Sequence, residues 1–161
     1  MSEPATERVF TTASAEATRA LAAALGGALE AGDVVLLEGG LGAGKTTFVQ
    51  GLARGMGLAA AVKSPTYTLV HQYRGAAGRP GLAHFDLYRI PAGRDLGDLG
   101  LDDARAQGAI VVEWGGRLAA GEPEAVRVTI DLPGGDDAPD ARTLRLVAAA
   151  GRGLCLVGGL A

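Results

Sequence analysis

Residues 39–46 of the chain read GGLGAGKT, a complete match to the phosphate-binding loop pattern G-x-x-x-x-G-K-[ST]. Glycines in this pattern let the backbone turn closely around an anion, and successive backbone N–H groups then point at the β- and γ-phosphates of a nucleotide. Lys45 adds a positive charge at these phosphates, and the hydroxyl of Thr46 is suited to ligate Mg²⁺. We therefore expect the nucleotide to be held by Gly40, Leu41, Gly42, Ala43, Gly44, Lys45, Thr46 and Thr47.

The residues on either side of this loop have the patterns of a strand and a helix. Val34–Glu38 is a short apolar run suited to a buried parallel strand, and Thr47–Arg54 has apolar residues at helical spacing. The alternative is a glycine-rich turn without function, in a chain that contains 26 glycines. The expected number of chance matches to this motif in a chain of this composition is roughly 0.004, so nucleotide binding is the favoured interpretation.

Composition and charge limit the class of protein. A length of 161 residues fits one domain spanning residues 1–161, and a net charge of −3 argues against autonomous nucleic-acid binding, which needs a basic surface. The single cysteine, Cys155, has no partner for an internal disulfide, and we interpret it as a small buried residue in a reducing compartment. No signal-peptide pattern or apolar run of membrane length is present, which predicts a soluble cytoplasmic protein.

Periodicity and turn residues predict the remaining elements. A helix is expected over residues 15–29 after the N-cap Ser14, and the acidic segment 91–106 is expected to be partly helical. The final dozen residues have too weak a pattern for an assignment. The expected strands cover residues 8–12, 34–38, 67–73, 82–88, 109–112, 125–132 and 143–149.

Hydrolysis of a bound nucleotide needs a carboxylate for Mg²⁺, a group that orients water and a sensor of the γ-phosphate. In open α/β sheets such groups lie beyond the carboxyl ends of the strands, and Asp86 and Glu113 both end apolar runs. Glu113 has the stronger apolar run, although each acid could instead be a surface carboxylate. Thr66 follows a Ser-Pro pair, where either a mobile γ-phosphate sensor or an ordinary strand threonine would fit.

The aromatic residues near these acids have simpler interpretations. Trp114 is the only tryptophan and fits packing in the core or a lid better than chemistry. His71 and His84 are expected to pack or to form hydrogen bonds, because no second His or Cys lies at metal-ligand spacing.

Four blocks of sequence, in this order, resemble the TsaE family. They are residues 39–48, 62–70, 84–89 and 112–114, and the part that carries these motifs runs from about residue 33 to residue 114. The chain departs from the family pattern at Gly40, where an acid is usual, and at Gly115, where a proline is common. The first change affects only a side-chain contact, because the phosphate cradle is made of backbone, and the second predicts a looser turn.

The resemblance implies an α/β domain of the P-loop NTPase type, with a mixed central sheet flanked by helices. It implies a cytoplasmic ATPase of bacterial tRNA threonylcarbamoyladenosine synthesis that binds ATP with Mg²⁺ and hydrolyses ATP slowly alone. The implied partner is a heterodimer of TsaD and TsaB, which modifies the adenosine next to the anticodon. The protein would then contact tRNA only indirectly, through that complex.

The resemblance also implies a role for each motif residue. Thr46 and Asp86 would hold Mg²⁺, with Glu113 as a further candidate ligand, and Lys45 would hold the phosphates. Glu113 would orient or deprotonate the attacking water, and Thr66 would belong to a switch-like loop. Trp114, after Glu113, would lie beside the site or a partner surface.

Two other functions remain open at this point. A small-metabolite or nucleotide kinase uses the same phosphate loop, with Arg89 and Arg94 as candidate lid residues. A binding module that responds to a nucleotide without hydrolysing it would share the loop as well. Transfer of phosphate to a small acceptor would identify the kinase. Absence of ATP turnover would identify the binding module.

Overall fold

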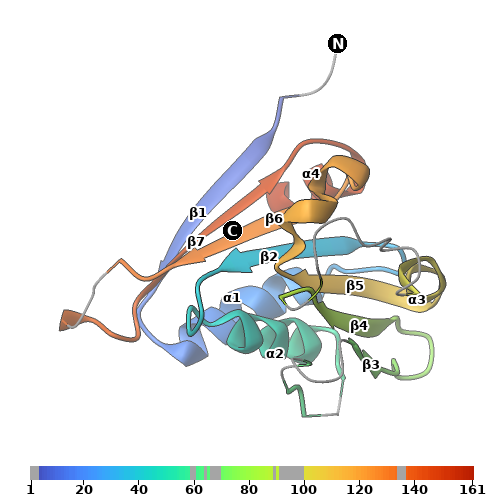
Figure 1. Cartoon of the computed structure of the whole chain (residues 1–161), viewed down its shortest axis with the longest axis horizontal. Helices are drawn as coiled ribbons and strands as arrows, with labels where there is room; N and C mark the ends of the chain where they lie inside the picture. The colour runs from blue at the N-terminus through green and yellow to red at the C-terminus, as the bar shows by residue number, and fades with distance from the viewer. Residues whose placement is uncertain are drawn as a thin grey trace.

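The computed structural model describes residues 4–58, 61–63, 65, 70–88, 90, 100–133 and 137–161. Over these residues the chain forms a seven-stranded mixed sheet with helices on both faces, which confirms the predicted fold class (Figure 1). The strands are β1 (Thr6–Thr12), β2 (Val34–Gly39), β3 (Val70–Tyr73), β4 (Gly81–Asp86), β5 (Gly108–Glu113), β6 (Val126–Asp131) and β7 (Arg142–Ala148). The helices are α1 (Ala15–Gly26), α2 (Lys45–Gly55), α3 (Leu101–Gln107), the 3-10 helix η2 (Gly115–Gly121) and α4 (Gly151–Gly158).

The strand order is β1-β7-β6-β2-β5-β4-β3, and the middle of the sheet is parallel. Strand β2 pairs in parallel with β5 and β6, and β5 pairs in parallel with β4. The outer strands β1, β7 and β3 add to this centre in antiparallel pairs. Because β2, β4 and β5 run the same way, their carboxyl ends meet at one edge of the sheet, where the glycine-rich loop begins.

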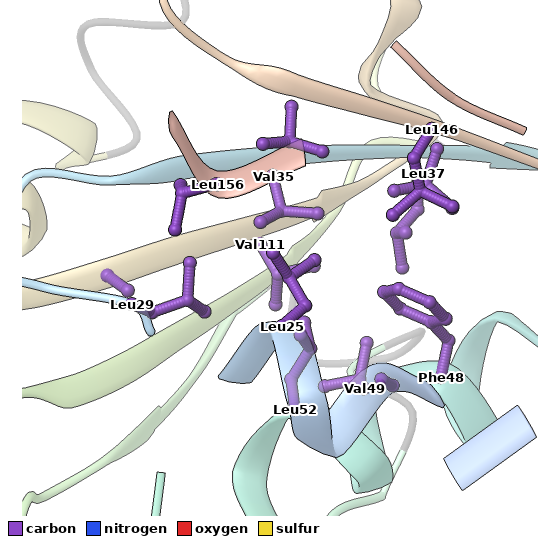
Figure 2. Close-up of a cluster of buried hydrophobic side chains, with 14 of the residues drawn as sticks. Leu25, Leu29, Val35, Leu37, Phe48, Val49, Leu52, Val111, Leu146 and Leu156 are labelled. Atoms are coloured by element: carbon purple, nitrogen blue, oxygen red, sulfur yellow. The ribbon is translucent and has the colours of Figure 1, made fainter. Parts of the chain in front are cut away.

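Both faces of the central strands are covered, as their continuous apolar runs predict. On one face, α1 and α2 pack against alternate strand residues such as Val35 and Leu37, with Leu25 and Phe48 pointing up from the helices (Figure 2). The intervening strand residues face a second cluster that includes Leu101 of α3. The central sheet is therefore a rigid support for the loop edge.

Helices α1 and α2 pack so closely that Gly51 of α2 has no room for a side chain. Gly51 of α2 faces α1, and a Cβ atom added there would lie 2.5 Å from the carbonyl oxygen of Arg19 and 2.6 Å from the Cβ of Ala22. Both neighbours are backbone or backbone-adjacent atoms, so neither can move without shifting a helix.

We expect Gly51→Ala to lower the free energy of unfolding by about 1–3 kcal/mol, the usual cost of overpacking a well-packed core. The matched control is Gly158→Ala at the end of α4, where nothing lies within 4 Å of the added Cβ. That variant should be neutral or more stable by up to about 1 kcal/mol, because alanine favours helix more than glycine does. Chemical denaturation followed by circular dichroism measures both values, and equal stabilities would contradict the packing argument.

The structure corrects several sequence expectations. Helix α1 begins after the N-cap Ser14 as predicted but ends at Gly26 instead of residue 29, because the Gly-Gly pair favours a turn there. Within the acidic segment the structure describes residues from Gly100 onward, and helix α3 begins there at Leu101. The final dozen residues contain helix α4, and Cys155 on it is exposed, so its interpretation as a buried residue was wrong.

Within the described part of the chain, none of the helices has the length and apolar character needed to cross a membrane.

Candidate functional site

The glycine-rich loop connects the end of β2 to the start of α2 and depends on two left-handed glycines. Gly42 has φ 76° and Gly44 has φ 105°, a backbone region that residues with a Cβ rarely adopt. Gly44 is the N-cap of α2, whose first turn is fully described and has no side-chain cap. The positive end of this helix therefore remains available to an anion, as the motif predicts.

Lys45 is the first residue of α2, and its side chain folds back over the loop. Its Nζ donates hydrogen bonds to the carbonyl oxygens of Gly39 at 2.8 Å and Gly40 at 2.9 Å, and only 7% of the residue is exposed. The ammonium also lies 4.7 Å from the centre of the Trp114 ring. Burial lowers the pKa of Lys45, while the nearby negative charges, Glu113 first among them, act in the opposite direction.

Asp86 and Glu113 end the neighbouring parallel strands β4 and β5 and are register partners. Both are buried, and the Oδ1 of Asp86 accepts a hydrogen bond of 2.9 Å from the backbone N–H of Tyr88. A cavity of about 530 Å³ is lined by both acids together with Leu41, Gly42, Gly44, Lys45, Thr46, Thr47, Tyr88, Trp114 and Arg142. The structure thus brings the acids together with six of the eight loop residues expected to hold a nucleotide.

Glu113 has a buried partner on β4. The Nε2 of His84 lies 3.1 Å from the Oε1 of Glu113, and His84 is fully buried. This agrees with the expectation that His84 packs or forms a hydrogen bond. Among the residues that the structure describes, no group of three or more His, Cys, Asp or Glu side chains is placed to hold a metal ion.

The rim of the cavity beside β5 is aromatic. The ring of Trp114 lies 5.0 Å from that of Tyr88, with the two planes inclined by 41°. Trp114 has φ 59°, the only positive value among the described residues other than glycine. The turn after Trp114 is anchored by Glu38 of β2, whose Oε1 accepts a hydrogen bond from the backbone N–H of Gly116. The hydrogen bond of Glu38 to the next turn and the contact with Tyr88 therefore hold Trp114 beside Lys45 in a strained backbone conformation.

One residue of this site has no counterpart in the sequence predictions. Arg142, the first residue of β7, donates from Nε to the carbonyl oxygen of Ala43 at 2.7 Å and from Nη1 to that of Pro139 at 2.6 Å. Its Nη2 reaches the carbonyl oxygen of Gly42 at 3.5 Å. Arg142 thus ties the loop to the antiparallel side of the sheet from a position 99 residues along the chain, where no motif marks it.

Three residues of the sequence analysis lie outside the described part of the chain. They are Thr66, the candidate γ-phosphate sensor, and the candidate lid residues Arg89 and Arg94.

Comparisons with known proteins agree with one family. A protein of Streptomyces coelicolor named tRNA threonylcarbamoyladenosine biosynthesis protein TsaE is 42% identical over 116 residues, which are 71% of this chain and 78% of that protein. A Treponema pallidum protein of the same name is 43% identical over 120 residues, covering 74% of this chain and 86% of its own length. The crystal structure of Bacillus subtilis YdiB matches with a TM-score of 0.77 and 32% identity, over 99% of this chain and 97% of that one.

The family model described as threonylcarbamoyl adenosine biosynthesis protein TsaE matches residues 12–143. This span includes the loop, both buried acids and Arg142, so every residue that lines the cavity lies inside the match. The chain belongs to the TsaE family.

Proposed function

We propose that this protein binds and hydrolyses ATP as a subunit required for threonylcarbamoyladenosine modification of tRNA next to the anticodon. The observation that carries the proposal is the single cavity lined by the phosphate loop, by Lys45 and by the buried acids Asp86 and Glu113. A loop alone supports phosphate binding, whereas the two acids beside it would supply two groups that hydrolysis needs, a ligand for Mg²⁺ and a group that orients water. The family and its relatives' names support the tRNA modification pathway.

The donors in this cavity fit ATP with Mg²⁺. Magnesium prefers oxygen ligands and is usually held by one or two carboxylates together with substrate phosphates, so a cluster of three acids is not required. The hydroxyl of Thr46 and the carboxylate of Asp86 line the same cavity and would hold the ion, with Glu113 as an additional candidate. When bound, Mg²⁺ would offset negative charge on the β- and γ-phosphates.

The remaining residues have separate tasks in this proposal. Lys45 contacts the β- and γ-phosphates through its ammonium group, and the backbone N–H groups from Gly40 to Thr47 surround them. Glu113 orients the attacking water and accepts its proton. Thr66 belongs to a loop that responds to the γ-phosphate.

We propose a heterodimer of TsaD and TsaB as the partner, in the cytoplasm. The net charge of −3 supports contact with tRNA through that complex rather than directly. If this partner completes the site, the isolated protein should hydrolyse ATP slowly.

The test is ATP turnover measured for the purified protein alone and with purified TsaD–TsaB heterodimer. We expect slow turnover alone and faster turnover with the heterodimer, and both should require Mg²⁺. A parallel reaction with a panel of small phosphate acceptors, followed by phosphorus NMR, distinguishes the kinase alternative. Absence of turnover under every condition would favour a nucleotide-responsive binding module and contradict the proposal.

A further inference from the structure

We propose that His84 is a positioning residue for Glu113, whose carboxylate it holds in place through a hydrogen bond from Nε2. The inference rests on the proposed function, because it gives Glu113 a supporting group for its role toward water. Its basis is the 3.1 Å contact between Nε2 of His84 and Oε1 of Glu113 in the buried interior.

The sheet fixes the relative position of the two side chains. His84 is the register partner of Val111, and Glu113 follows Val111 by two residues, so both side chains project from the same face of neighbouring parallel strands. Val111 belongs to the core cluster under α1 and α2, so this is the face toward α2, on which Lys45 lies. The pair is therefore a diagonal contact between neighbouring strands, and the register of the sheet fixes the relative positions of the two backbones.

The hydrogen-bonding capacity of the pair assigns its protons. An ionised carboxylate only accepts, so the Nε2 of His84 must carry the hydrogen. The Nδ1 of His84 is buried and has no hydrogen-bond partner among the described residues. With a neutral imidazole, this atom is an unpaired acceptor.

Two other placements of the hydrogens are conceivable, and both put an N–H group at Nδ1 of His84. An imidazolium carries hydrogens on both nitrogens, and a protonated Glu113 donating to Nε2 would move the imidazole hydrogen to Nδ1. Either would leave a buried N–H group at Nδ1 with no acceptor among the described residues, which costs the desolvation of that group. The contacts thus favour a hydrogen bond in which Nε2 of His84 donates and Oε1 of Glu113 accepts.

This arrangement restrains Glu113 without using up its capacity as an acceptor. A carboxylate has about four lone-pair sites, and His84 occupies one of them. The group still lines the cavity and can accept a hydrogen bond or a proton from water there. Because His84 is fully buried and does not line the cavity, its effect on turnover should pass through Glu113 alone.

Two substitutions that differ only in reach test this inference. In His84→Gln the side-chain amide nitrogen can reach the position of Nε2 and donate to Glu113, whereas in His84→Asn it ends near the position of Nδ1. We expect His84→Gln to keep kcat within about 3-fold, and His84→Asn to lower kcat by about 10- to 100-fold, the loss expected for one hydrogen bond to a charged group. The ATP Kd and KM should remain within about 2-fold in both variants, because neither removes a phosphate contact.

A double variant separates positioning from a general effect on folding. If His84 acts through Glu113, adding His84→Asn to Glu113→Gln should change the remaining turnover by less than about 2-fold. Should His84→Asn fail to fold, His84→Met takes its place, since methionine fills similar space without a donor. Thermal unfolding of each variant identifies a folding failure before kinetics are compared.

Three results would overturn the role of His84 while leaving the proposed function intact. They are an equal loss of kcat in the Gln and Asn variants, an Asn effect on KM alone, and a further loss when His84→Asn is added to Glu113→Gln. Failure of the wild-type protein to turn over ATP with the heterodimer would instead reject the proposed function, and this inference with it.

Discussion

Replacing Lys45 with alanine is expected to abolish ATP binding at ordinary assay concentrations. The ammonium lies over the loop, bonded to the carbonyl oxygens of Gly39 and Gly40 and nearly excluded from solvent. A charged hydrogen bond of this kind contributes about 1.5–3 kcal/mol, and Lys45 would make more than one to the phosphates, so the Kd should rise by at least about 100-fold. Isothermal titration with Mg-ATP measures the change.

The control for Lys45 removes a positive charge elsewhere. Arg8 lies on the edge strand β1 and is exposed, so Arg8→Ala alters the net charge equally without touching the cavity. Its Kd for ATP should match that of the wild-type protein. If Lys45→Ala also kept the wild-type Kd while remaining folded, the loop could not be the phosphate site.

Replacing Glu113 with glutamine is expected to leave ATP binding intact and to stop turnover. Glutamine has nearly the same shape, and its amide oxygen can still accept the hydrogen bond from His84. The carboxylate, however, is the group proposed to take a proton from water, a contribution worth about 100- to 10,000-fold in rate. We therefore expect kcat to fall by at least about 100-fold while the Kd for ATP changes by less than about 3-fold.

The matched control for Glu113 is an acid at the same edge of the sheet. Asp131 ends the parallel strand β6 but is exposed and does not line the cavity, so Asp131→Asn should keep wild-type turnover. Single-turnover measurements with the heterodimer compare the two variants directly. Full activity in Glu113→Gln would show that another group activates the water.

The candidate site was predictable where its residues are marked by local sequence. The phosphate loop has a fixed spacing, and Asp86 and Glu113 each end an apolar run, so a parallel sheet brings them to one edge. The pairing of β4 with β5 then places the two acids in register, which a pattern in either strand alone does not specify.

The parts that sequence reasoning missed depend on contacts between distant segments. Arg142 reaches the loop from β7, and Glu38 reaches the turn at Gly116, through side chains whose positions are set only by the assembled sheet. Helix α4 was not predicted because its many glycines have low helix propensity, and burial of Leu156 and Val157 against the sheet stabilises it instead.

The pairing of β1 with β7 has a consequence for how the protein is made. These strands lie at opposite ends of the chain, with about 130 residues between them, yet they are neighbours at one edge of the sheet. At a synthesis rate of about 5–20 residues per second, roughly ten seconds pass between the emergence of β1 and that of its partner. The first strand therefore waits for its partner during synthesis, and its unpaired edge is open to wrong pairing or to capture by a chaperone in that time.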